Sequence, residues 1–243
     1  MEESDLKLFD SIAADYSKKD IYPVSSLARR AQLFTMINLI GRQYFRNVLD
    51  LGCGPGFNSF YLKDIYEKYT GIDYSSNFID IAKKIHKKGN FIQGNVKELH
   101  LLFSEEYDII MGVGVLHHID DLGKAFSSIK TISGRNTIKA FIEPQNGNPI
   151  VQLLRRIRKR LDKSYSKDQI FFTKEELTEL MKSHGFEIIK IKYQGYFSTP
   201  FAQVILKPAF LFFPICKLAV LLDDLIFRYF NNSWSWNIIV IVK

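Results

Sequence analysis

Residues 48–56 constrain the fold of this chain more than any other segment. An apolar run ends in Asp50 and Leu51, glycines then occupy positions 52, 54 and 56, and a helix-like stretch follows. Because glycine lacks a Cβ atom, a ligand can approach the backbone of such a turn closely. The first turn of the following helix directs unpaired N–H groups toward the same place. The pattern predicts a strand, a ligand-binding turn and a helix in succession.

Short apolar runs alternate with helix-like segments from residue 46 to residue 142. Strands are predicted at 47–51, 69–73, 90–93, 107–111 and 136–142, and helices at 57–69, 76–88 and 121–132. Ser75 and Asp120 suit the N-caps of the second and third of these helices. Apolar strands that alternate with helices are typical of a parallel sheet covered on both faces.

The flanking segments extend this pattern. Apolar positions recur at helical spacing on both sides of Pro23, and Gly41 suits a helix stop. Thr173 with Glu176 predicts a later helix start, and two more strands are predicted at 186–193 and 234–242. We therefore divide the chain into a helical cap at 1–45, a ligand-binding domain at 46–194 with 234–243, and an apolar helical insertion at 195–233.

The glycine-rich turn, D-L-G-C-G-P-G at residues 50–56, resembles motif I of the class I S-adenosylmethionine-dependent methyltransferases. The rest of that pattern follows in order, with Asp73 at the end of the second strand, Q-G-N-V at 93–96 and L-H-H at 116–118. The last motif and the segment 9–16 resemble the branch that includes the ubiquinone and menaquinone methyltransferases. The resemblance covers residues 5–142. A dinucleotide-binding domain would instead carry G-x-G-x-x-G, and residue 57 is Phe.

This resemblance implies a Rossmann-like, doubly wound, mostly parallel seven-stranded α/β sheet, and S-adenosylmethionine as cofactor. Asp73 would take both ribose hydroxyls, since a carboxylate accepts two O–H bonds at once. Asp50 would orient the methionine end, and Asn95, where the family usually has Asp, would lie beside the adenine. Cys53 is expected to pack within the turn rather than react. The cofactor residues implied by the resemblance are Tyr16, Asp50, Gly52, Cys53, Gly54, Gly56, Asp73, Tyr74, Asn95, Val96, Gly112 and Val113.

Three residues are candidates for the acceptor side of the site. His117 and His118 follow the fourth strand and Glu143 follows the fifth, where the strand ends of an open parallel sheet line the ligand crevice. Either histidine can remove a proton at neutral pH, with a slight preference for His117, and Glu143 can meet a hydroxyl or amine. The alternative roles are packing and anchoring the turn. Methyl transfer depends mainly on alignment, so a strong base is not required. No metal site is expected.

Charge and the apolar insertion indicate possible partners. The chain has 33 Lys and Arg against 26 Asp and Glu, and this net charge of +7 favours anionic partners. The amphipathic basic segment from Arg155 to Lys163 and the apolar run from Phe201 to Leu222 suit an anionic membrane surface. The alternatives are a solvated helix face and a helical pair packed on the core.

The leading hypothesis is methyl transfer to a hydrophobic or lipid-linked small molecule. Alternatives are a soluble metabolite or natural-product sugar with the insertion as a lid, RNA methylation, and a non-catalytic partner subunit. Nucleic acid is not expected, since basic and aromatic residues are not interleaved. Pro208 and Pro214 are expected to break the apolar run into pieces too short to span a membrane. We expect a cytoplasmic protein, with peripheral attachment to a membrane as a further hypothesis.

Overall fold

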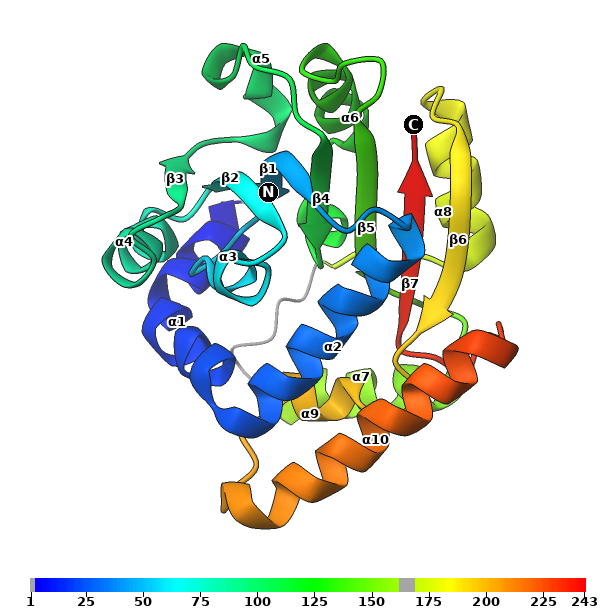
Figure 1. The fold of residues 1–243 in the computed structure, drawn as a ribbon. Helices are drawn as coiled ribbons and strands as arrows, with labels where there is room; N and C mark the ends of the chain where they lie inside the picture. Colours follow the sequence, from blue (N-terminus) through cyan, green and yellow to red (C-terminus); the bar gives the residue numbers. More distant parts are fainter. Residues whose placement is uncertain (1–2, 162–168) are drawn as a thin grey trace.

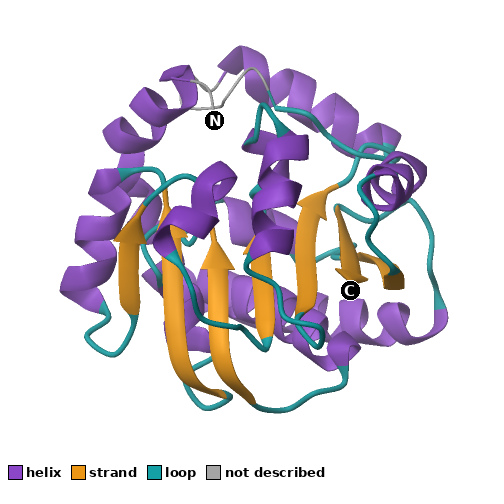
Figure 2. Cartoon of the chain, turned by 90° about the horizontal axis from the view of Figure 1, so that it is seen from above, coloured by secondary structure: helices purple, strands orange, loops and turns teal. Residues whose placement is uncertain are grey.

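The computed structural model describes residues 3–161 and 169–243, and its centre is one sheet with helices on both faces (Figures 1 and 2). The strands are β1 (Phe45–Leu51), β2 (Tyr66–Asp73), β3 (Asn90–Gln93), β4 (Ile109–Val113), β5 (Ile138–Pro144), β6 (Ile188–Gln194) and β7 (Asn237–Val242). Their order is β3-β2-β1-β4-β5-β7-β6, and β7 runs antiparallel to both of its neighbours while the other pairs are parallel. The predicted seven-stranded, mostly parallel α/β fold is confirmed.

Helices precede, connect and follow these strands. The α-helices are α1 (Glu3–Ile21), α2 (Pro23–Ile40), α3 (Phe57–Tyr61), α4 (Ser76–Ile85), α5 (Leu99–Leu102), α6 (Leu122–Thr131), α7 (Pro149–Leu161), α8 (Lys174–Ser183), α9 (Thr199–Gln203) and α10 (Ala209–Tyr229), with short 3-10 helices η1 (Val96–Glu98) and η2 (Leu116–His118). Pro23 begins α2, and Gly41, with a φ of 79°, ends it. The sequence predicts Pro23 as the break between two helices and Gly41 as a helix stop. Pro23 takes the first position of the second helix because its fixed φ and missing N–H suit a helix start, and glycine suits the left-handed cap.

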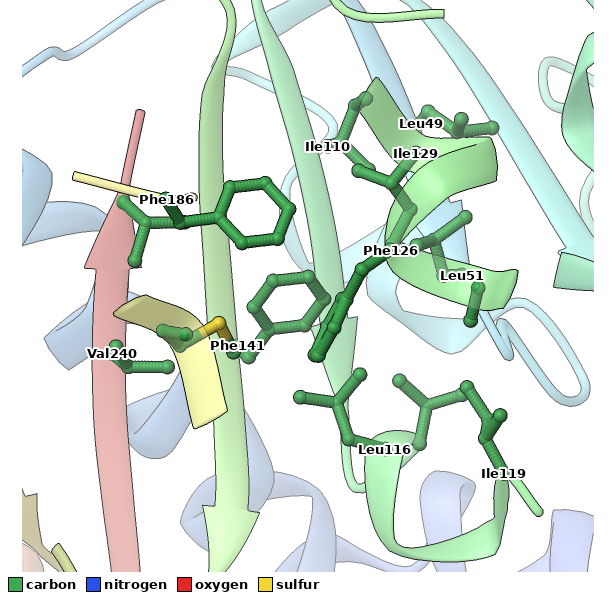
Figure 3. Packing of buried hydrophobic residues seen from close by; sticks show 14 of the residues in the cluster. Leu49, Leu51, Ile110, Leu116, Ile119, Phe126, Ile129, Phe141, Phe186 and Val240 are labelled. Atoms are coloured by element: carbon green, nitrogen blue, oxygen red, sulfur yellow. The ribbon is translucent and has the colours of Figure 1, made fainter. Parts of the chain in front are cut away.

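The central strands β1, β4, β5 and β7 are largely buried on both faces, so each supplies two hydrophobic layers. Leu49, Ile110 and Phe141 face the layer that contains α6 and α8 (Figure 3). The intervening residues, such as Val48 and Met111, face the layer that contains α2, α3 and α4. Since successive side chains of a strand point to opposite faces, this alternation explains why the strands read as continuous apolar runs.

Side-chain caps begin several of the helices. Ser75 accepts a hydrogen bond from the N–H of Phe78 at the start of α4, and Thr173 forms a capping box with Glu176 at the start of α8. Both caps are as predicted. The predicted cap of α6 was wrong by one residue, because Asp121 fills that place and the carboxylate of Asp120 is paired with a lysine ammonium.

The largest error in the predicted elements is the helix at 57–69. The helix α3 ends at Tyr61, and β2 begins at Tyr66 because that residue pairs with Phe45 at the start of β1. Hydrogen bonding to the sheet overrides the local helical spacing here. The other predicted strands begin within three residues of their observed starts.

The insertion predicted at 195–233 contains α9 and α10, and α10 lies along α2 (Figure 1). The helices α9 and α10 both contact α2, and these contacts bury the side chains of Val24 and Ala28 on α2, Ala202 on α9 and Cys216 on α10. The expected break at Pro214 is wrong, since α10 continues through it. Pro214 removes one N–H donor from the helix, but it is solvent-exposed, as is Phe210 one turn earlier, so water can bind the freed carbonyl. None of the described helices is both long and apolar enough to cross a membrane.

Candidate functional site

A pocket lies where the glycine-rich turn meets the loops that follow β2, β3 and β4. It collects residues from segments up to 67 positions apart in the chain. Five of the predicted cofactor residues and one predicted catalytic histidine lie together in its wall. The lining residues are Gly52, Asp73, Tyr74, Gly94, Asn95, Val96, Val115, His118 and Ile119. The pocket is therefore at the carboxyl-end edge of the parallel strands, where the sequence had placed it.

The glycines of the turn have different functions. Gly52 has a φ of 63°, and a Cβ there would lie 2.6 Å from a side-chain carbon of Val115. Gly54 has a φ of 53°, but a Cβ there would meet no atom within 4 Å. The space over Gly54 is thus open on the side where a ligand would approach. We infer that Gly52 is needed for packing and Gly54 for ligand access.

The carboxylate of Asp73 is held rigidly at the end of β2. One oxygen accepts a hydrogen bond from the N–H of Gly54 at 2.8 Å, and the other accepts from the N–H of Ser75 at 2.9 Å. Burial raises the pKa of Asp73 to about 6. Each oxygen keeps a further lone pair, so the group can accept two hydroxyl donors from a ligand in the pocket.

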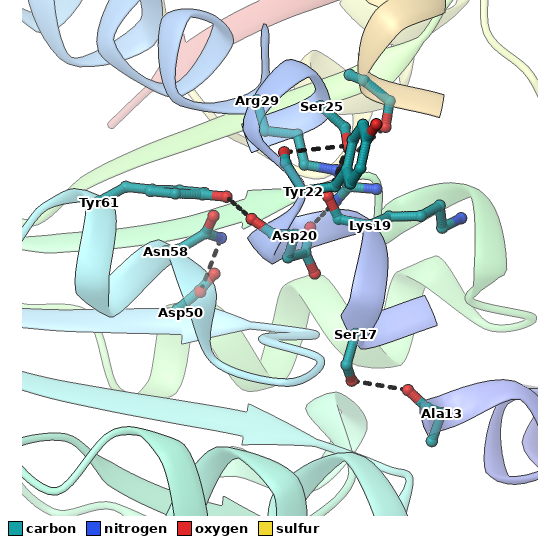
Figure 4. A network of polar contacts seen from close by, with 11 residues as sticks. Ala13, Ser17, Lys19, Asp20, Tyr22, Ser25, Arg29, Asp50, Asn58 and Tyr61 are labelled. Atoms are coloured by element: carbon teal, nitrogen blue, oxygen red, sulfur yellow. Dashed lines mark hydrogen bonds and ion pairs between the residues drawn. The ribbon is translucent and has the colours of Figure 1, made fainter. Parts of the chain in front are cut away.

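Asp50 is a fully buried carboxylate at the end of β1. Its Oδ2 atom accepts a hydrogen bond from the hydroxyl of Tyr69. The same oxygen accepts another from the amide of Asn58 at 3.0 Å (Figure 4). Its Oδ1 atom has no hydrogen-bond partner among the described residues. Burial raises the pKa of Asp50 to about 7. A buried carboxylate oxygen without a donor fits a site that is completed by a bound polar group or water.

Asn95, Val96 and Tyr74 complete the side of the pocket formed by the ends of β2 and β3. The side-chain oxygen of Asn95 accepts a hydrogen bond from the N–H of Lys97 at 3.0 Å, which fixes its orientation at the start of η1. That oxygen has a second lone pair, so the amide can still accept a donor from a ligand. The predicted role of Asn95 beside an adenine ring remains compatible with this position.

The remaining predicted cofactor residues lie outside the pocket lining. Cys53 is buried, with its sulfur packed over the backbone of Gly71, and burial raises the pKa of its thiol well above the ordinary value. This agrees with the expected packing role. Gly112 and Val113 end β4 beside β1, and their predicted contact with the cofactor stays a prediction.

Helix α1 lies over one side of this pocket. The ring centroid of Phe9 is 5.0 Å from that of His118, and Asp10 accepts hydrogen bonds from the hydroxyl of Ser75 and, through its carbonyl, from the amide of Asn77. The predicted cofactor residue Tyr16 packs edge-on against Phe78 rather than into the pocket lining. The helical N-terminal segment therefore contacts the pocket through its first half.

A buried polar network fixes α1 to α2 and α3 (Figure 4). The guanidinium of Arg29 is 2.8 Å from the carboxylate of Asp20, and the hydroxyl of Tyr61 donates to the carbonyl of Asp20 at 2.7 Å. The Arg29 guanidinium lies over the ring of Tyr16 and lowers the pKa of that phenol. Because the Asp20–Arg29 pair is largely buried, it ties the end of α1 to the domain more firmly than a surface pair would.

Glu143 and His117 form a buried pair at the end of β5. The Nδ1 atom of His117 is 2.7 Å from Glu143 Oε2, while Oε1 accepts hydrogen bonds from the N–H groups of Val115 and Leu116 at 3.0 and 2.8 Å. Burial, followed by the proximity of His118, lowers the pKa of His117. Both carboxylate oxygens of Glu143 are thus engaged in holding the loop that carries the two histidines.

His118 rather than His117 lines the pocket, although the sequence had slightly favoured His117. The two imidazoles are adjacent, with ring centroids 4.1 Å apart. Phe171 stacks on His117 at 5.8 Å. The partly exposed imidazole of His118 lies in the pocket wall and contacts the half-buried ring of Phe9, while the half-buried ring of Phe171 contacts the buried His117.

The model of the methyltransferase domain family matches residues 25–191 of this chain, from α2 through β6. The chain belongs to the methyltransferase domain family. A protein named a probable S-adenosylmethionine-dependent methyltransferase, from Saccharomyces cerevisiae, is 27% identical over 108 residues, which cover 41% of this chain and 37% of that protein. The match thus spans less than half the length of that curated relative.

Solved methyltransferase structures share the whole fold. A SAM-dependent methyltransferase from Thermotoga maritima has a TM-score of 0.71 and 16% identity, covering 98% of this chain and 99% of that one. The plantazolicin methyltransferase, solved with a triazolic desmethylPZN analog and SAH, has a TM-score of 0.65 and 19% identity, covering 99% and 94%. The chain therefore carries the methyltransferase domain and has the fold of S-adenosylmethionine-dependent methyltransferases, whose cofactor is S-adenosylmethionine.

The residues present fit this cofactor. The open space over Gly54 allows a ligand to approach the backbone closely. The carboxylate of Asp73 in the pocket wall can accept hydrogen bonds from a diol. The Oδ1 atom of Asp50, which has no hydrogen-bond partner among the described residues, offers a buried polar contact. The sequence had not singled out Val115 and Ile119, which also line the pocket. Their position on both sides of the L-H-H motif was the available signal. Phe9 belongs to the segment 9–16 that carries the family resemblance, whereas Phe171 had no such signal, since its partner His117 lies far away in the chain.

Proposed function

We propose that this methyltransferase transfers a methyl group from S-adenosylmethionine to a hydrophobic small molecule that enters beside His118. The observation that carries this proposal is the pair of aromatic rings around the two histidines. Phe9 lies against His118 and Phe171 against His117, and both phenylalanines are half-buried rather than enclosed in the core. Aromatic rings at the edge of a pocket favour an acceptor with an apolar or aromatic body.

The chain's own residues would bind and orient the reactants. The Asp73 carboxylate accepts the ribose hydroxyls, the Asn95 amide meets the adenine edge, and the turn at Gly54 leaves room for the cofactor backbone. S-adenosylmethionine, when bound, would supply a methyl group on a sulfonium. An aligned nucleophile of the acceptor would bond to the methyl carbon as the S–CH3 bond breaks, and S-adenosylhomocysteine would leave with the electron pair. The contribution of the protein is mainly alignment and exclusion of water.

His118 is the residue best placed to take a proton from the acceptor. It lines the pocket, whereas His117 is buried behind it and bonded to Glu143. Because Glu143 holds Nδ1 of His117 and the N–H groups of the loop, we assign this pair a positioning role. The sequence slightly favours His117 of the two candidate histidines, and this proposal assigns the role of the base to His118 instead.

The test is a methyl-transfer assay with labelled S-adenosylmethionine and an extract of the source cells, followed by partition between an organic and an aqueous phase. Label in the organic phase is expected. A Phe171→Ser variant should lose most of that label, and Phe60→Ser, at an exposed phenylalanine on α3, should keep it. Label confined to the aqueous phase would contradict the hydrophobic acceptor and favour a soluble metabolite or sugar.

The role of His118 is tested on the identified acceptor. His118→Asn should lower kcat by about a hundredfold. A variant that retains the rate would refute the base assignment while leaving the acceptor class standing.

A further inference from the structure

Helix α7 has its apolar stripe on the outside. Ile150, Leu153, Leu154 and Ile157 are between 44% and 56% exposed. The side that faces the protein carries Val151, which is buried, and Arg155, which donates to the carbonyl of Gln145 at 2.7 Å and lies over the ring of Phe171. An ordinary surface helix is oriented the other way, with its apolar stripe toward the core.

Helix α10 also leaves a broad apolar face without a partner among the described residues. Only its narrow opposite side, around Cys216 and Ala219, is buried against α2. Phe210 is 81% exposed, and large apolar side chains continue along the outward face for the length of the helix, about 30 Å. The exposed apolar residues of this face are Phe210, Leu211, Ile215, Leu218, Leu221, Leu222, Leu225 and Tyr229. Soluble monomers rarely expose apolar patches of this extent.

The charges on these helices indicate which partner would cover them. The helix α7 contains five Lys and Arg and no Asp or Glu, and Arg156 and Arg160 are exposed beside its apolar stripe. On α10, Asp223 turns inward and accepts hydrogen bonds from the backbone N–H groups of residues 196–198, and Asp224 is paired with Arg228. Lys217 is exposed on the same helix. The combined surface is apolar and basic.

Helices α7 and α10 both lie beyond the carboxyl ends of the parallel strands (Figure 1). We propose that the exposed faces of α7 and α10 dock this methyltransferase onto an anionic lipid membrane. Apolar side chains would enter the boundary between headgroups and acyl chains while the arginines meet anionic headgroups. A second copy of the chain fits less well, because a two-fold contact would bring two surfaces of the same positive charge together.

The sequence had assigned membrane contact to the segments from Arg155 to Lys163 and from Phe201 to Leu222. The structure corrects this in part, because Arg155 faces inward and α9 packs on α2. Residues 162 and 163 lie outside the described residues. Membrane docking rests on the proposed function in one respect: a hydrophobic acceptor explains why the enzyme would bind a membrane. It is tested without cofactor or acceptor, so the two proposals can fail separately.

The experiment is co-sedimentation of the full chain with vesicles of phosphatidylcholine alone or with a third of phosphatidylglycerol, at low and high salt. We expect binding to the anionic vesicles that weakens with salt. Arg156→Glu with Arg160→Glu, and separately Leu218→Ser with Leu225→Ser, should each lower the partition coefficient at least about tenfold. The matched controls are Lys83→Glu with Lys84→Glu on α4 and Leu101→Ser on α5, all exposed and distant from this surface.

Three outcomes would overturn the proposal. The wild-type chain could fail to sediment with anionic vesicles at low salt. The control variants could lose binding as much as the α7 and α10 variants, which would indicate attraction by net charge alone. Finally, sedimentation velocity could show a dimer that the α10 variants dissociate and that does not bind vesicles, in which case a second copy covers this face.

Discussion

The buried carboxylate of Asp50 should make the stability of this protein depend on pH. In the native state it accepts hydrogen bonds from Tyr69 and Asn58, but its Oδ1 atom has no partner among the described residues, and its pKa is raised from 3.8 to about 7. A native carboxyl with a raised pKa contributes stability that is fully present below the unfolded pKa and is lost as pH rises through the native pKa. The loss therefore falls between about pH 4 and pH 7.

The substitution Asp50→Asn removes this titration and keeps an oxygen for Tyr69 and Asn58. Each pKa unit corresponds to about 1.4 kcal/mol, and about two units of the range from pH 4 to pH 7 lie above pH 5. The free energy of unfolding of the variant, relative to that of the wild type, should therefore rise by about 3 kcal/mol from pH 5 to pH 8. Urea unfolding at the two pH values measures it. In thermal unfolding the same change in free energy corresponds to a shift of roughly 6–12 °C in the difference between the two Tm values.

The control for this prediction is Asp64→Asn, at an exposed aspartate next to α3. It should leave the pH dependence of unfolding unchanged. Asp50→Asn should also weaken the binding of S-adenosylhomocysteine. The buried carboxylate lowers the stability of the protein, and a destabilising group of this kind is retained where function requires it. If the stability difference between Asp50→Asn and wild type is the same at pH 5 and pH 8, the reasoning about this carboxylate is wrong.

Three further predictions concern the turn, α1 and α8. Gly54→Val should weaken the binding of S-adenosylhomocysteine at least about tenfold, as measured by calorimetry. The positive φ at this position should lower the free energy of unfolding of the variant by about 1–2 kcal/mol. Unchanged affinity would mean that the ligand does not pass over Gly54. Arg29→Met leaves the buried carboxylate of Asp20 unpaired and should destabilise the protein by about 3–5 kcal/mol in urea, whereas a loss below 1 kcal/mol would show that the pair is effectively solvated. Thr173→Ala breaks the capping box with Glu176 and should cost about 1 kcal/mol, unless α8 is held by its packing alone.

The sequence was sufficient for features that depend on neighbouring residues. The glycine turn, the carboxylate at Asp73 and the caps at Ser75 and Thr173 are each fixed by a few consecutive positions, because backbone conformation and short-range hydrogen bonds determine them. The alternation of strands and helices was equally readable, since both faces of the sheet are buried. These features bring Gly52, Asp73 and Asn95 into the wall of one pocket, at the edge of the sheet where the strand order predicts a ligand crevice.

Features that depend on distant partners were not predictable in the same way. The helical spacing after Gly56 suggested a long helix, but pairing with Phe45 makes Tyr66 the start of a strand. The amphipathic pattern of α7 was visible, yet it did not tell which side faces the protein. The proposed choice of His118 over His117 rests on Glu143, which lies in the next strand and binds His117.

The most direct test of the cofactor site is the affinity for S-adenosylhomocysteine of the wild-type chain and of Asp73→Ala, measured by calorimetry at neutral pH. The account predicts binding of one molecule per chain by the wild type. It predicts at least about a hundredfold weaker binding by Asp73→Ala, since two hydrogen bonds to a charged group contribute about 1.5–3 kcal/mol each. Thermal unfolding of the free variant shows whether it remains folded. A folded Asp73→Ala variant with wild-type affinity would contradict the assignment of this pocket as the cofactor site.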